Sequence, residues 1–209
     1  AEHSNGSSGG IEARLRNAYA LTGGYVDWLR ANVNRIDRVS VDGWQKHMIA
    51  DYAEFVADMR AKPNTDPRKL DCHDTKELPT RISRQLIRLA RCYAFVMNRD
   101  RVDKDTMRLV RDRALDTSRG RTVDLLRWFM CIDERTSHTY QDGGGLMTSL
   151  LCRWAQWESE PKLLQYLAFL VKIGVVEHVV QQHSHGSWRL TDRMERIWRS
   201  VWGMAGTQA

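Results

Sequence analysis

Apolar residues recur three or four positions apart over most of the chain, which is the spacing of an amphipathic α-helix. The clearest case lies between residues 41 and 62. One face of that helix would carry six apolar side chains, namely Met48, Ile49, Tyr52, Phe55, Val56 and Met59. Asp42 stands just before them and is the expected N-cap. The pattern therefore predicts one long helix with a buried face.

The same spacing predicts three further helices in the first half of the chain. They cover residues 11–33, with a break at Gly23–Gly24, then 81–98, and then 103–115 with Asp103 as N-cap. We expect the four helices to form one compact bundle. Residues 63–79 are polar and contain prolines, so we expect an exposed loop there.

The pattern changes after the turn residues 116–120, where we place a domain boundary. Short apolar helices are predicted over residues 122–131, 146–157 and 160–173, the last ending at Gly174. Strands over 175–182 and 187–191 and a final helix capped by Asp192 follow. Three helices and then a strand hairpin are typical of a winged helix, a relative of the helix-turn-helix.

The predicted fold is therefore mainly α, with a small β-hairpin wing. Residues 1–10 have the composition of a linker or a cloning remnant. Residues 11–118 would form the helical domain and 119–209 the winged-helix domain.

Residues 80–107 carry two stripes. Apolar side chains share one helix face, and arginines at positions 81, 84, 88 and 91 form a basic stripe beside it. This segment resembles the C-terminal lid of MCM-type replicative helicases, whose ATPase belongs to the AAA+ class. The matching features are Thr80-Arg81, Ile87-Arg88-Leu89-Ala90, Ala94, Val102 and Asp103 to Asp105. A weaker resemblance extends upstream to Tyr25.

The resemblance implies a role for the arginine that opens this helix. In the family, the matching residue is the sensor-two arginine, which reaches the ATP phosphates at a subunit boundary. Arg81 occupies that position, and Arg84 would assist or line the lid surface. The resemblance also implies a hexameric helicase acting in DNA replication, and many MCM proteins carry a winged helix after the lid.

The sequence has no G-x-x-x-x-G-K-[ST] phosphate loop and no acidic magnesium-binding strand motif. We therefore expect ATP and Mg²⁺ to bind only in the context of a full helicase. The chain would then work with other helicase subunits or with the ATPase core of the same protein. Whether it belongs to an enzyme depends on that context.

The formal net charge of +6 comes largely from arginine, which favours nucleic acid or nucleotide phosphate as a partner. No apolar run is long enough to predict a membrane partner. The four cysteines lie far apart, so we expect no metal site and reduced thiols in a cytoplasmic (nucleoid) or nuclear setting.

In a winged helix the third helix would enter the DNA major groove. Its candidate DNA-binding residues are Lys162, Gln165, Tyr166 and Lys172, and the second wing strand adds Arg189. The core would take the remaining large side chains of that helix, Leu163, Leu164, Leu167, Leu170 and Val171. Two lysines are few, so weak duplex binding or protein docking is expected. Trp154, Trp157, Trp198 and Trp202 are expected in the core, whereas for Trp188 two roles stay open, capping the core or contacting a base.

The sequence thus predicts the lid and winged-helix segment of an MCM-like, ATP-dependent DNA helicase. Two alternatives stay open. One is the C-terminal region of an origin-recognition-type initiator, which would need a more basic third helix. The other is a stand-alone winged-helix DNA-binding regulator with a helical dimerisation domain, which needs no nucleotide.

Overall fold

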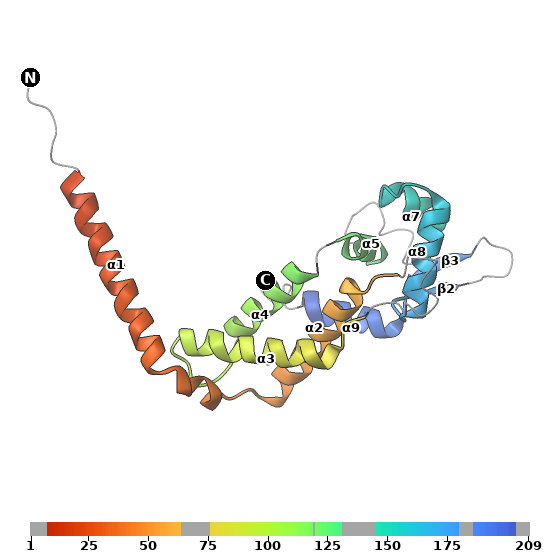
Figure 1. Ribbon diagram of the computed structural model, residues 1–209. Coiled ribbons are helices and arrows are strands. Elements are labelled where there is room, and N and C mark those ends of the chain that lie inside the picture. Colours follow the sequence, from red (N-terminus) through yellow and green to blue (C-terminus); the bar gives the residue numbers. More distant parts are fainter. Residues whose placement is uncertain (1–7, 64–75, 119, 131–144, 180–185, 204–209) are drawn as a thin grey trace, which may run out of the picture.

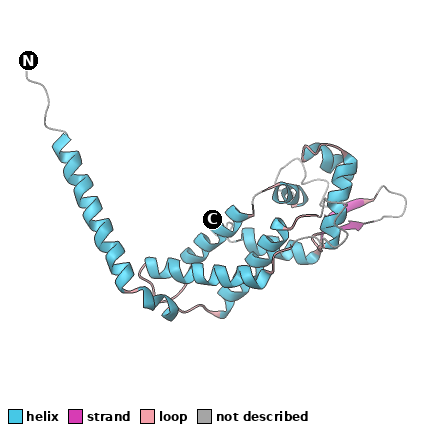
Figure 2. Cartoon of the chain, in the orientation of Figure 1, coloured by secondary structure: helices cyan, strands magenta, loops and turns pink. Residues whose placement is uncertain are grey.

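The structure is a computed structural model, and it describes residues 8–63, 76–118, 120–130, 145–179 and 186–203 (Figure 1). The described part is mainly helical and contains one small three-stranded antiparallel sheet (Figure 2). The prediction of a mainly α protein with a small β element is therefore confirmed. Most of the expected 63–79 loop and residues 183–185 of the expected turn lie outside the described residues.

Three helices form the bundle of the first half: α2 (Gly43–Arg60), α3 (Pro79–Val96) and α4 (Lys104–Thr117). The two N-caps predicted for these helices, Asp42 and Asp103, are confirmed. Asp42 precedes α2, and its backbone N–H donates to the side chain of Gln45. The Gln45 amide also donates to the Val102 carbonyl at 2.6 Å, which ties the start of α2 to the start of α4. Asp103 accepts from the Thr106 backbone N–H at 2.9 Å.

The helix α1 (Ser8–Ala31) differs from the prediction in two ways. It continues through Gly23–Gly24 without a break, and it extends away from the bundle instead of joining it (Figure 1). Only its C-terminal end packs on the body, where Trp28 stacks on Phe95 with ring centroids 5.6 Å apart. A short 3-10 helix, η1 (Val33–Arg38), then leads to α2. The periodicity of α1 predicted a helix but could not show that the helix lies outside the bundle.

The second half runs α5 (Arg121–Phe129), β1 (Leu146–Met147), α7 (Thr148–Trp154), α8 (Glu160–Lys172), β2 (Val176–Val179), β3 (Ser187–Leu190) and α9 (Asp192–Trp202). The sheet order is β1-β3-β2, and β2 pairs with β3 from Val176 opposite Leu190 to Val179 opposite Ser187. The helix expected over 146–157 is shorter, because its first two residues form β1 and the helix ends at Trp154.

Two local details explain the chain path around the sheet. Gly174 has φ +74° and ends α8, as the sequence predicted. Gly145 passes so close to β3 that an added Cβ would lie 2.4 Å from the Trp188 carbonyl oxygen, so only glycine fits there. The N-cap of α9 is Thr191, whose hydroxyl accepts from the Met194 N–H at 3.3 Å, and the expected cap Asp192 is the first helical residue.

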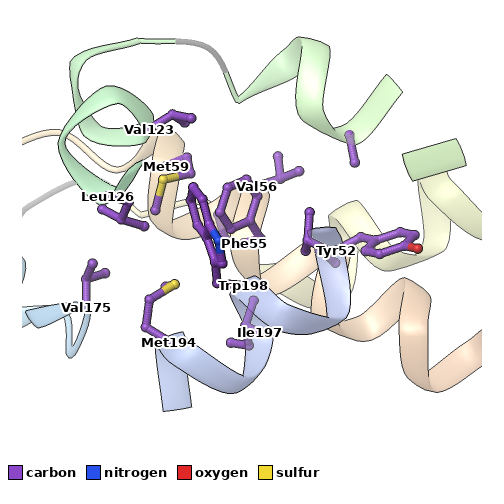
Figure 3. Close-up of a cluster of buried hydrophobic side chains, with 14 of the residues drawn as sticks. Tyr52, Phe55, Val56, Met59, Val123, Leu126, Val175, Met194, Ile197 and Trp198 are labelled. Atoms are coloured by element: carbon purple, nitrogen blue, oxygen red, sulfur yellow. The ribbon is translucent and has the colours of Figure 1, made fainter. Parts of the chain in front are cut away.

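The hydrophobic core is continuous from the first half of the chain to the second. Side chains of α2, α5 and α9 meet in one cluster, in which Trp198 packs edge-on against Phe55 with ring centroids 5.9 Å apart (Figure 3). Residues 118–120 do separate α4 from α5, where the sequence placed the domain boundary. The division into two domains stays a prediction, and the two parts share a packed interface.

Candidate functional site

The start of α3 positions the first predicted site residue. Pro79 occupies the first turn of the helix, where its missing N–H costs nothing, and Arg81 follows two residues later. The Arg81 side chain is 72% exposed, and its Nε lies 4.0 Å from a Glu77 carboxylate oxygen. A contact this long and exposed holds the guanidinium weakly, so it is free to reach another molecule.

The basic stripe of α3 is shorter than the sequence suggested. Arg84 and Arg88 are exposed like Arg81, and no carboxylate among the described residues pairs with either. Arg91 is half-buried, and its Nε is buried without a hydrogen-bond partner in the described part of the chain. The opposite face of α3 is buried through Ile82, Leu86, Ala90 and Ala94, and Phe95, which follows the arginines on their own side of the helix, is buried as well. The exposed stripe therefore consists of Arg81, Arg84 and Arg88.

The predicted DNA-binding residues lie on two elements, α8 and β3. Lys162 is paired with Glu158, and its hydrogen bond to that carboxylate lowers the Glu158 pKa. Gln165 and Lys172 are exposed on α8, whereas Arg189 lies on β3 and pairs with Glu177.

Tyr166 is half-buried and packs against the core. Its hydroxyl is hydrogen-bonded to that of Thr122, and its ring centroid lies 5.1 Å from that of Trp157. Burial raises the pKa of Tyr166, so the phenol stays protonated at neutral pH. The Tyr166 hydroxyl is therefore engaged in a hydrogen bond with α5.

Two residues expected in the core lie on the surface instead. Leu164 is 43% exposed and Val171 is 41% exposed, and the exposed Ala168 lies between them on α8. Positions 164, 168 and 171 share one helix face. The prediction was wrong because the buried face of α8 is rotated toward Phe169 and consists of Leu163, Leu167, Phe169 and Leu170.

The four tryptophans expected in the core behave as the sequence predicted. Trp198 is buried, and the half-buried Trp154, Trp157 and Trp202 pack against the core. Trp188 is also buried, and its indole N–H donates to the Thr148 hydroxyl at 2.9 Å. These rings therefore stabilise the fold.

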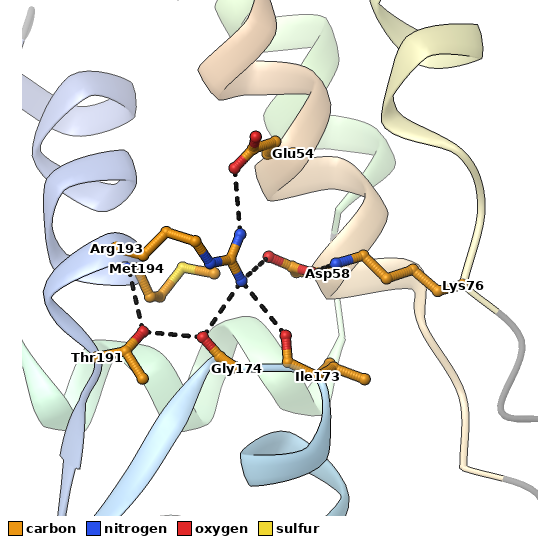
Figure 4. Close-up of polar contacts among 8 residues, drawn as sticks. All are labelled: Glu54, Asp58, Lys76, Ile173, Gly174, Thr191, Arg193 and Met194. Carbon is orange, nitrogen blue, oxygen red and sulfur yellow. Dashed lines mark hydrogen bonds and ion pairs between the residues drawn. The ribbon is translucent and has the colours of Figure 1, made fainter.

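A charged network that the sequence did not reveal joins α2 to α9 (Figure 4). The Asp58 side chain is fully buried and accepts from the Arg193 guanidinium at 2.9 Å, while Lys76 pairs with its other oxygen. Arg193 also contacts Glu54 at 3.1 Å and donates to the Gly174 carbonyl at 3.2 Å. Asp58 lies outside the apolar face predicted for α2, one turn after Glu54, so periodicity gave no signal that it is buried.

A pocket of about 680 Å³ opens beside this network, where α2 ends and α5 begins. We call it the α2–α5 pocket. Its charged and aromatic lining consists of Arg60, Lys62, Lys76, Glu77, Arg121 and Tyr166. Cations outnumber carboxylates there, so the pocket attracts anions.

Several sequence predictions concern other chemistry. Cys92 and Cys152 are half-buried free thiols, and Cys72 and Cys131 lie outside the described residues. Within the described ranges, no group of three or more His, Cys, Asp or Glu side chains is placed to hold a metal ion. In the same ranges, no helix has the length and apolarity needed to cross a membrane.

Comparison with known proteins finds no match: no protein-family model, no curated protein and no solved structure matches the chain.

Proposed function

We propose that the chain is the lid and winged-helix segment of an MCM-like, ATP-dependent DNA helicase. The observation that carries the proposal is the geometry at the start of α3. Arg81 projects from the first turn with 72% of its side chain exposed, while the other face of α3 is packed on α2. An arginine that acts on a neighbouring subunit needs this combination of a fixed backbone and a free guanidinium.

The order of elements in the second half supports the proposal. In a winged helix, three helices are followed by a strand hairpin, and α5, α7, α8, β2 and β3 follow in that order. β1 pairs with β3 and adds a third strand. A lid followed by a winged helix is the arrangement that the MCM resemblance implies, in a nucleoid or nuclear setting.

In this role the chain contributes a phosphate contact and not a complete nucleotide site. ATP and Mg²⁺ would be held by the phosphate loop of a neighbouring subunit, where Mg²⁺ neutralises phosphate charge. Arg81 would donate to the ATP phosphates, and its fixed positive charge would stabilise the charge that develops during hydrolysis. Arg84 lies one turn further along the same exposed face and is positioned to assist.

The test is an Arg81→Ala variant in an intact assembly that contains an ATPase core. We expect the steady-state ATPase rate to fall at least about tenfold, the lower end for a phosphate-contacting arginine. The melting temperature should stay within a few degrees, because an exposed arginine contributes little to stability. The matched control is Arg88→Ala, two turns further along the stripe, which should leave the rate nearly unchanged. An equal effect of both variants, or unfolding of Arg81→Ala, would contradict the assignment.

A second candidate function is protein docking by the winged-helix part. The exposed face of α8 carries the apolar side chains Leu164, Ala168 and Val171, and Lys162 on that helix is already paired with Glu158. Such a surface fits another subunit of the assembly better than a DNA groove, whose readers are mainly Arg, Lys, Asn and Gln. This also weighs against the origin-recognition alternative, which needs a more basic α8.

Fluorescence anisotropy with a labelled DNA duplex separates the two roles of α8. If α8 contacts the duplex, Lys172→Glu should weaken DNA binding, and Leu164→Ser should not. If it docks a protein, Leu164→Ser should disrupt association with the ATPase-containing assembly.

A further inference from the structure

We infer that the α2–α5 pocket is a binding site for phosphate groups. Three segments that are distant in the sequence build it: the C-terminal end of α2 with Lys62, the residues Lys76 and Glu77 before α3, and the start of α5. Tyr166 of α8 completes the wall. The pocket is therefore made by the tertiary fold and lies where the two halves of the chain meet.

The charge of the lining favours an anion. Arg60, Lys62, Lys76 and Arg121 face a single lining carboxylate, Glu77. Lys62 has no ion-pair partner in the described part of the chain. Since Asp58 lies behind Lys76 and is fully buried, it holds that ammonium in place at the pocket wall.

The remaining cations are held loosely enough to serve a ligand. Arg60 is 48% exposed and contacts Glu77 at 3.1 Å, and Arg121 is 68% exposed and lies 3.5 Å from Glu158. Exposed ion pairs of this kind contribute little free energy, so a phosphate can replace the carboxylates at small cost. Arginine forks also match phosphate oxygens in geometry.

The backbone at the start of α5 adds to this attraction. The N-cap of α5 is Gly120, which has no side chain to accept from the first-turn N–H groups. Those N–H groups and the positive end of the helix dipole favour a negative group there. Gly120 also leaves space, because an added Cβ would meet nothing within 4 Å. Asp124 in the same turn is 68% exposed and lies 3.8 Å from Arg127, so its charge is partly offset.

The ligand class is a phosphate ester or anhydride, from either a nucleotide or the backbone of single-stranded DNA. A pocket of about 680 Å³ lies within the range of small-molecule sites, so a pyrophosphate group fits with room for part of a nucleoside. The inference does not rest on the helicase proposal. Arg81 does not line the pocket, and binding can be measured on this chain alone.

The experiment is calorimetric titration of the full chain with sodium pyrophosphate and with ATP, alongside anisotropy of a labelled oligothymidylate. Lys62→Glu and Arg121→Glu each reverse one charge in the pocket. The matched control is Lys46→Glu, the same substitution at an exposed position on the opposite end of α2. Arg121→Glu places an acid at the first position of α5, where the helix dipole favours it, so folding should be preserved. Melting temperatures check this for every variant.

We expect pyrophosphate to bind to the parent chain. Each pocket variant should lower the affinity for pyrophosphate by about tenfold or more, because charge-assisted hydrogen bonds are lost. Lys46→Glu should change binding less than about twofold. If ATP binding falls with the pocket variants and oligothymidylate binding does not, the phosphate comes from a nucleotide. The reverse result assigns it to DNA. Absence of pyrophosphate binding by the folded chain, or equal weakening by Lys46→Glu, would overturn the inference.

Discussion

Arg193 connects α9 to α2 and to the end of α8 through one guanidinium. It contacts the buried Asp58, the half-buried Glu54 and the carbonyl of Gly174. We predict that Arg193→Met lowers the free energy of unfolding by about 3 kcal/mol, because removing one partner leaves Asp58 buried with only Lys76 beside it. Arg193 is itself 34% exposed, which keeps the expected cost at the lower end of the range for buried pairs. Urea denaturation measures the change.

The control for this prediction is Arg196→Met, at an exposed position one turn later on the same helix. A surface substitution of this kind should stay within about 0.5 kcal/mol of the parent. Equal effects of the two substitutions would show that the network does not stabilise the fold.

At the scale of one element, α1 is a long helix with little tertiary support. Its N-terminal half carries the exposed apolar residues Ile11, Leu15, Tyr19 and Leu21, and its middle carries Gly23–Gly24. We predict that replacing both glycines with alanine slows amide hydrogen exchange in residues 11–22 by about tenfold or more. Each glycine costs a helix about 1 kcal/mol relative to alanine, and an added Cβ at either position meets nothing within 4 Å.

The control is Gly43→Ala, at the first position of α2, where an added Cβ also meets open space. It should leave exchange in α1 unchanged. If the double alanine variant also leaves it unchanged, α1 is not continuous across the glycine pair in solution.

At the scale of the whole molecule, one core spans both halves of the chain. Trp198 of α9 is 3% exposed and packs on Phe55 of α2, which is fully buried. We predict that Trp198→Ala lowers the free energy of unfolding by about 3–5 kcal/mol, as expected for a large aromatic removed from a core. Both halves should still unfold in one transition, because they share this core. Hydrogen exchange checks this, since the slowest amides of α3 and of α8 should then reach the same free energy of opening.

Trp44→Ala is the matched control, since Trp44 lies on α2 and is 44% exposed. Trp44→Ala should change the free energy of unfolding much less than Trp198→Ala does. Separate transitions for α3 and α8 would instead support two independently folding domains divided near residue 118.

The sequence alone determined the type and order of most helices. Periodicity and caps placed α2 and α4 within a few residues, because Asp42 and Asp103 provide local signals that need no tertiary contact. The basic stripe at the start of α3 could also be predicted, because Arg81 and Arg84 lie outside the apolar face that the helix must bury.

Only the tertiary structure decided which apolar faces are covered. Leu164 of α8 and Leu21 of α1 carry the same helical signal as buried residues, but within the part of the chain that the structure describes both are exposed. The Asp58–Arg193 network and the α2–α5 pocket bring together residues that are more than a hundred positions apart in the chain. Periodicity records only the local path of the backbone, so it cannot place such residues side by side.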